Sequence, residues 1–200
     1  MENELLIDDP LKRVLSALYS AKDRHYHNLA HIEAMLALAG DYRGLLDDPE
    51  AVEAAIWFHD AVYDSRAKDN EAQSAALAEK KLAGRTEAGR LNRISAMIVA
   101  TATHLLPLFE DATAARDAGL FLDMDLSILG AAPDAFDAYE RAVRREYAWV
   151  EEPMWRAGRS AVLKNFLARP HIFHTEEFRQ RFELQARANM ARSLEALTAG

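Results

Sequence analysis

The chain of 200 residues carries 24 lysines and arginines against 32 aspartates and glutamates, a formal net charge of −8. This acidic balance argues against binding a nucleic-acid duplex, and the absence of cysteine excludes disulfides, thiolate nucleophiles and cysteine-based zinc sites. The apolar runs fall short of the ~20 residues that span a bilayer, and the N-terminal residues lack a signal-peptide pattern. We therefore expect a cytoplasmic protein that binds no membrane.

Apolar residues recur at helical spacing and rarely alternate, so the sequence predicts an all-α chain that forms one domain over residues 1–200. Residues 110–119 are predicted to form a loop. The first predicted helix begins at Pro10, and the last begins near Glu176. Between them we predict helices over about Asn28 to Gly40, Asp48 through His59, Asp69 or Asn70 to Gly84, about Glu87 to Leu105, Leu120 to Leu129, Asp134 to Val150 and Arg159 to Arg169.

Polar residues interrupt the apolar faces of two predicted helices. At about 100° per residue, His59 falls within the apolar arc of its helix, and Asp125 falls within the apolar arc of residues 120–129, with Asp123 on the opposite side. A carboxylate in an apolar face is costly unless a metal ion, an arginine or a helix N-terminus pairs with it. Each position taken alone therefore leaves a structural role open.

Four potential metal ligands occur in the order His31, His59, Asp60, Asp125, on separate predicted helices apart from the His59-Asp60 doublet. Two imidazoles and two carboxylates suit a divalent ion such as Mn²⁺, Co²⁺, Fe²⁺, Mg²⁺, Ni²⁺ or Zn²⁺. They also leave coordination positions open for water and substrate, as hydrolytic metals require. The combination predicts a divalent metal site.

His27 and His31 are one helical turn apart, which also suits a pair of metal ligands. A zinc protease would carry glutamate directly after the first histidine of such a pair, whereas this chain carries Asn28. Because that change removes the general base, the pattern excludes a zinc protease.

Five stretches carry a resemblance to a known family: RHYHNLAHIEAML (24–36), WFHDAVYD (57–64), DNEAQSA (69–75), TATH (101–104) and FLDMDLSILG (121–130). The chain resembles the HD superfamily, helical proteins named after their His-Asp doublet. It is most similar to the bacterial proteins described as predicted metal-dependent HD-superfamily phosphohydrolases. Weaker similarity continues through residues 158–173 and the following helix.

The resemblance implies an HD-type helical bundle in which His31, His59 and Asp60 bind the metal ion. The closing aspartate of the superfamily maps to Asp125, which precedes Leu126, and the apolar arc selects the same residue. Asp123 is the alternative if this segment is not helical.

Five further residues receive roles from the resemblance. Asp64 and Glu71 follow the doublet, as do the acidic residues that position the attacking water in related hydrolases. Arg24 is a candidate for binding phosphate. His27 and His104 are candidates for the substrate side or for supporting the metal ligands.

The function that the resemblance implies is hydrolysis of a phosphomonoester or phosphoanhydride in a nucleotide or another small phosphorylated metabolite. One alternative is a di-iron oxygenase of the HD type, which would use His27, His104 and Glu71 as additional ligands. Another is a non-catalytic module in which the metal braces the helices and the pocket binds a nucleotide. Metal identity separates the first two, and turnover separates the third. The sequence leaves the oligomeric state open.

Overall fold

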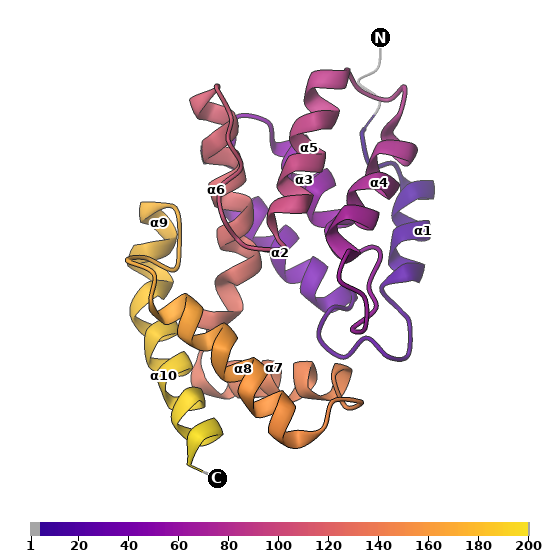
Figure 1. Ribbon diagram of the computed structural model, residues 1–200. Helices are drawn as coiled ribbons and strands as arrows, with labels where there is room; N and C mark the ends of the chain where they lie inside the picture. Colours follow the sequence, from indigo (N-terminus) through magenta and orange to yellow (C-terminus); the bar gives the residue numbers. More distant parts are fainter. Residues whose placement is uncertain (1–4, 200) are drawn as a thin grey trace. The chain divides into compact units, whose positions relative to one another are not determined.

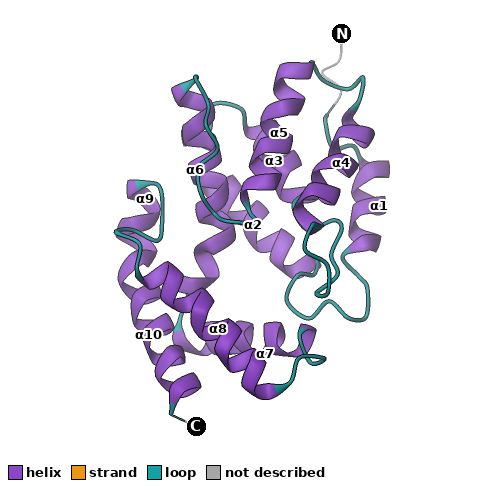
Figure 2. Cartoon of the chain, viewed as in Figure 1, coloured by secondary structure: helices purple, strands orange, loops and turns teal. Residues whose placement is uncertain are grey.

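The computed structural model describes residues 5–199, and the regular structure in this range is helical, apart from an isolated bridge between Ala83 and Thr86 (Figure 2). The all-α prediction is confirmed. The described residues fall into two compact units, 5–124 and 125–199. None of the helices in the described range is long and apolar enough to cross a membrane.

The helices of the first unit follow one another along the chain with loops between them (Figure 1). The division between the units falls inside the last of these helices, so Asp125 and Leu126 continue the same helix beyond residue 124. The elements are α1 (Asp9–Leu18), α2 (Leu29–Asp41), the 3₁₀ turn η1 (Arg43–Leu45), α3 (Pro49–Phe58), α4 (Asn70–Leu82), α5 (Ala88–Ala100) and α6 (Ala112–Leu126).

Side-chain caps define where three of these helices begin. The carboxylate of Asp8 accepts a hydrogen bond from the Leu11 N–H at 2.8 Å, and Asp48 accepts one from the Ala51 N–H at 3.1 Å. The Asn28 side chain accepts one from the Ala30 N–H at 2.9 Å. A proline also stands in the first turn of α1 and of α3, where it needs no hydrogen-bond partner. These caps confirm the predicted starts.

Helix α3 is the central helix of the first unit. Seven of its ten residues are buried, and it packs against α1, α2, α4 and α5. A helix with so wide an apolar surface is stable only inside a core. The residue that follows its last turn, His59, is therefore placed inside the unit.

The prediction of a loop over 110–119 was wrong, because α6 begins at Ala112. The carboxylate of Asp111 accepts a hydrogen bond from the Thr113 N–H at 2.9 Å, which satisfies a donor of the first turn. The alanines that follow have the highest intrinsic helix propensity. They extend the helix without the large apolar residues that the periodicity argument depends on.

Asp117 of α6 ties this helix to the start of α3. Its two carboxylate oxygens accept hydrogen bonds from the Asp47 N–H at 2.9 Å and from the Asp48 N–H at 2.8 Å. Burial raises the pKa of Asp117, the charges of Asp47 and Asp48 raise it further, and the two hydrogen bonds oppose the rise. The connection fixes α6 beside the helix that carries His59.

In the second unit, α8 begins at Glu152 instead of the predicted Arg159, because Pro153 in its first turn starts the helix earlier. The predicted last helix is divided by a π-helical turn. The Cβ of an alanine at Gly130 would lie 2.6 Å from the Cβ of Phe182 in that turn, so only glycine fits there. The elements are η2 (Ser127–Gly130), α7 (Pro133–Glu146), α8 (Glu152–Leu167), α9 (Glu176–Phe178), the π-helical η3 (Arg179–Glu183) and α10 (Leu184–Thr198).

Candidate metal centre

Three potential ligands from three helices converge. His31 is in the first turn of α2, His59 follows the last residue of α3, and Asp125 is the penultimate residue of α6. Each offers one ligand atom, and these atoms lie within 4.8 Å of one another. His31 is 7% exposed and His59 is 1% exposed, whereas Asp125 is half-buried. This group could hold a metal ion.

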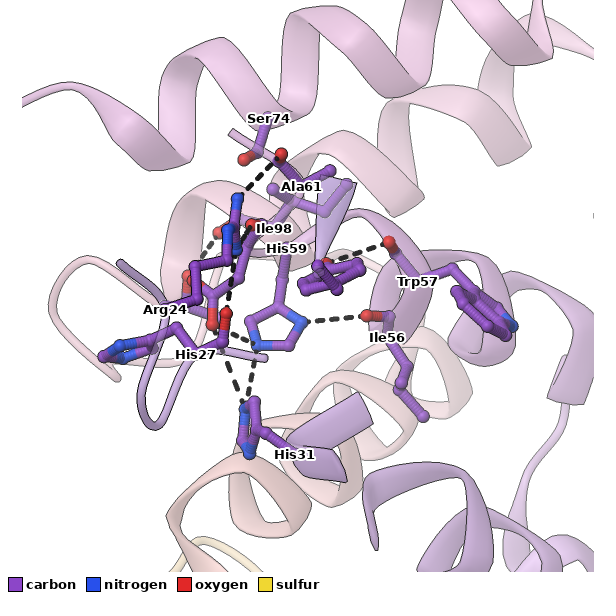
Figure 3. A network of polar contacts seen from close by, with 12 residues as sticks. Arg24, His27, His31, Ile56, Trp57, His59, Ala61, Ser74 and Ile98 are labelled. Atoms are coloured by element: carbon purple, nitrogen blue, oxygen red, sulfur yellow. Dashed lines mark hydrogen bonds and ion pairs between the residues drawn. The ribbon is translucent and has the colours of Figure 1, made fainter. Parts of the chain in front are cut away.

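The orientation of the His59 ring is fixed by a backbone carbonyl. Its Nδ1 lies 2.9 Å from the Ile56 oxygen, one turn earlier (Figure 3). A carbonyl oxygen only accepts, so Nδ1 carries the hydrogen of this bond. The lone pair of the neutral ring is then on Nε2, the tautomer that a metal ligand needs.

The spacing of the two imidazoles suits a shared ion. The His31 Nε2 and His59 Nε2 atoms are 3.2 Å apart. Two ligands at about 2.1 Å from one metal ion, with an angle of roughly 90–109° between them, lie about 3.0–3.4 Å apart. The observed distance falls within this interval.

The Asp60 carboxylate adds a further potential ligand atom close to the Nε2 atoms of both histidines. Its Oδ2 lies 3.0 Å from the His59 Nε2 and 3.9 Å from the His31 Nε2. Burial works to raise the pKa of Asp60, but the neighbouring His59, His27 and His31 lower it well below its usual range. An ionised carboxylate and an imidazole lone pair repel each other at this distance. A positive centre, either a proton or a metal ion, must lie between them.

Helix α6 brings Asp125 to the histidines through its neighbour one turn earlier. Phe121 and Asp125 lie four positions apart and share a helix face. The Phe121 ring meets the His59 ring edge-on, with centroids 6.0 Å apart. Asp123 was the alternative ligand only if this segment were not helical. The segment is helical, and Asp123 is fully buried in α6.

The loop after the doublet is attached to α4. Ser74 of α4 bonds to both the N–H and the carbonyl of Val62, at 3.1 and 3.2 Å. Asn70 does the same for the backbone of Asp64, at 3.0 and 2.9 Å. These bonds hold the two predicted acids in place relative to the doublet.

Asp64 and Glu71 differ in what their carboxylates do. Asp64 is exposed, and its Oδ1 accepts a hydrogen bond from the Arg66 N–H at 2.8 Å, which closes the turn. Glu71 is half-buried in the first turn of α4, and the described residues give its carboxylate no hydrogen bond or ion pair. Their predicted role in orienting water remains a prediction.

Of the three remaining predicted residues, Arg24 and His27 lie beside the doublet. Arg24 is buried and donates hydrogen bonds to backbone carbonyls, including that of Asp60 at 2.7 Å. The His27 ring stacks on Tyr63, with centroids 4.4 Å apart. His104 follows α5 with a left-handed φ of 51°, which is uncommon for a residue with a side chain. Their roles toward substrate remain predictions.

Ile56, Phe121 and Ser74 also take part in the site and were not predicted from the sequence. Ile56 and Phe121 are apolar residues of the helices that carry His59 and Asp125, where periodicity predicts only a place in the core. Ser74 is a small polar residue at a fully buried position of α4. Like His59, it could have been recognised as a polar residue on a buried helix face.

Comparison of the chain with protein-family models, curated proteins and solved structures found no match. Membership of the HD superfamily therefore remains an expectation that rests on the quoted motifs.

Proposed function

We propose that the protein is a metal-dependent phosphohydrolase that acts on a nucleotide or another small phosphorylated metabolite. The observation that carries the proposal is the approach of Asp60 Oδ2 to within 3.0 Å of the His59 Nε2, whose ring is oriented by Ile56. With His31 and Asp125 in one group with His59, these donors match the charge and ligand types of a divalent ion that retains open coordination positions.

In this proposal His31, His59, Asp60 and Asp125 hold the ion. A divalent ion in such a site supplies Lewis acidity toward a phosphoryl oxygen and toward water. Glu71 accepts the proton of the attacking water, because its carboxylate is not engaged by other described residues. The water oxygen bonds to phosphorus and the bond from phosphorus to the leaving oxygen breaks. The leaving oxygen takes up a proton from solvent and departs as the alcohol or the remaining phosphate, and the transferred phosphate is released.

Asp64 has a different role in the proposal. Its carboxylate already closes the turn at Arg66, so we assign it to the shape of the loop. Glu71 is therefore expected to affect turnover more than Asp64 does.

A phosphate-release assay tests the proposal. The protein would be loaded in turn with Mn²⁺, Co²⁺, Mg²⁺ and Ni²⁺ and presented with nucleotides and sugar phosphates. We expect release that disappears in His59→Ala and persists in Asp134→Asn, a change at an exposed acid of α7. A metal-loaded wild type that releases no phosphate from any of them would overturn hydrolysis. Dioxygen consumption by the iron-loaded protein would support the oxygenase instead.

A further inference from the structure

The guanidinium of Arg24 is buried directly behind the His59-Asp60 doublet. Arg24 is 8% exposed. Its Nη1 donates to the His27 carbonyl at 2.9 Å and to the Asp60 carbonyl at 2.7 Å, and its Nη2 donates to the Ala61 carbonyl at 3.1 Å (Figure 3). A single planar group thus joins the backbone at His27 to the backbone at Asp60 and Ala61, two segments that are far apart in the sequence.

Two aromatic rings complete the surroundings of this cation. The Arg24 Cζ lies 5.0 Å from the ring centroid of Tyr19 and 5.4 Å from that of Tyr63. Burying a cation is costly unless polar groups replace its hydration. Carbonyl dipoles and aromatic faces supply that replacement here, so the arrangement is specific for a group of this shape and charge.

The two joined segments are the ones that present the metal ligands. His27 lies four positions before His31, in the stretch that leads into α2, and Asp60 directly follows His59. Tyr63 also stacks on the His27 ring. The position of the Arg24 fork therefore sets the spacing between the chain that carries His31 and the chain that carries the doublet.

We propose that Arg24 is a positioning residue that fixes the geometry of the metal centre, and that it acts through the backbone carbonyls of Asp60, Ala61 and His27. The inference rests on the metal centre of the proposed function but not on hydrolysis. It differs from a direct contact with phosphate, for which only the two N–H groups not used in the three bonds would remain.

Replacing arginine by lysine keeps the charge but removes the planar fork that binds several acceptors in fixed positions. Residues that orient metal ligands typically alter metal affinity by about 10–100-fold. We therefore expect Arg24→Lys and Arg24→Gln to weaken Co²⁺ binding by about that factor.

Titration with Co²⁺ provides the test, because the visible spectrum of bound cobalt reports its coordination geometry without any need for turnover. Arg24→Lys should weaken binding and change the spectrum. Arg85→Lys is the matched control, since Arg85 pairs with Asp8 on the surface of the same unit, and it should behave as the wild type. Tyr63→Leu, which leaves the guanidinium in place, should shift both quantities in the same direction by less, and it replaces the Arg24 variants if they do not fold.

An Arg24→Lys protein with wild-type cobalt affinity and spectrum, and a raised KM alone, would overturn the inference in favour of direct phosphate binding. If the Arg24 variants do not fold, an unchanged spectrum in Tyr63→Leu would overturn it. A wild type that binds cobalt but hydrolyses nothing would overturn the proposed function. The cobalt spectra of the variants would then still decide whether Arg24 positions the metal ligands. A wild type that binds no cobalt would overturn both.

Discussion

Replacing Asp125 by asparagine should remove most of the stabilisation that a metal ion gives to the fold. The ion, when bound only to the native state, stabilises it by RT ln(1 + [L]/Kd), which is about 2.7 kcal/mol at a hundredfold excess over Kd. For a chain of 200 residues, each kcal/mol shifts the Tm by about 2–4 °C. We therefore expect Mn²⁺ at that excess to raise the Tm of the wild type by about 5–10 °C.

The Asp125→Asn protein keeps the size of the side chain but loses the charge that faces His31 and His59. If its Kd rises a hundredfold, the same Mn²⁺ concentration stabilises it by only about 0.4 kcal/mol, or about 1 °C. Thermal unfolding with and without a chelator measures both shifts. Asp134→Asn, an exposed acid in the first turn of α7, is the control and should retain the full shift. A full shift in Asp125→Asn would refute the assignment of Asp125 as a ligand.

Four further substitutions test the mechanism and the stability of each unit. Glu71→Gln should lower kcat by about 10²–10⁴-fold with metal content unchanged, whereas Asp64→Asn should cost less; equal turnover in Glu71→Gln and the wild type would contradict the assigned base. Asp48→Ala should lower the free energy of unfolding in urea by about 1–2 kcal/mol, because it removes the cap of α3 and one of the two carboxylates that pair with Arg90. Burial opposes ionisation of Asp48, but Arg90 and the Ala51 N–H hold its pKa below the ordinary 3.8. The stabilisation that Asp48 gives is therefore complete above pH 3.8 and is lost as the pH falls through the lowered pKa. If Asp48→Ala and the wild type still differed by the same free energy of unfolding far below pH 3.8, this explanation would be wrong. Gly130→Ala should cost about 1–3 kcal/mol, because its Cβ would collide with backbone and side chain of Phe182; wild-type stability would show that the turn yields.

The parts of the fold that the sequence predicted are those with a local chemical signal. Asp48 and the proline after it mark the start of α3, and Asn28 marks the start of α2. The starts of α6 and α8 carry similar signals, Asp111 and Pro153. The start of α6 was missed because residues 112–119 carry no large apolar side chain. The start of α8 was missed because Met154 and Trp155 are followed by residues 156–161, which carry none and interrupt the helical repeat.

From helical periodicity alone, the candidate site could be predicted only where it interrupts an apolar face; His31 and Asp60 were predicted from the motif and its resemblance. His59 and Asp125 are polar residues within apolar arcs, so periodicity singled them out, and the structure places them in one group with His31. The bonds of Arg24 could not be predicted in the same way. Their acceptors are backbone carbonyls, which every residue possesses, so no residue type marks them.

We propose that His31, His59, Asp60 and Asp125 bind one divalent ion. Anomalous diffraction from a crystal grown with Mn²⁺ tests it most directly. We expect a manganese peak within about 2.0–2.3 Å of the His31 Nε2, the His59 Nε2 and a carboxylate oxygen of both Asp60 and Asp125. A crystal with no peak among these side chains, and with Asp125 turned away from His59, would contradict it.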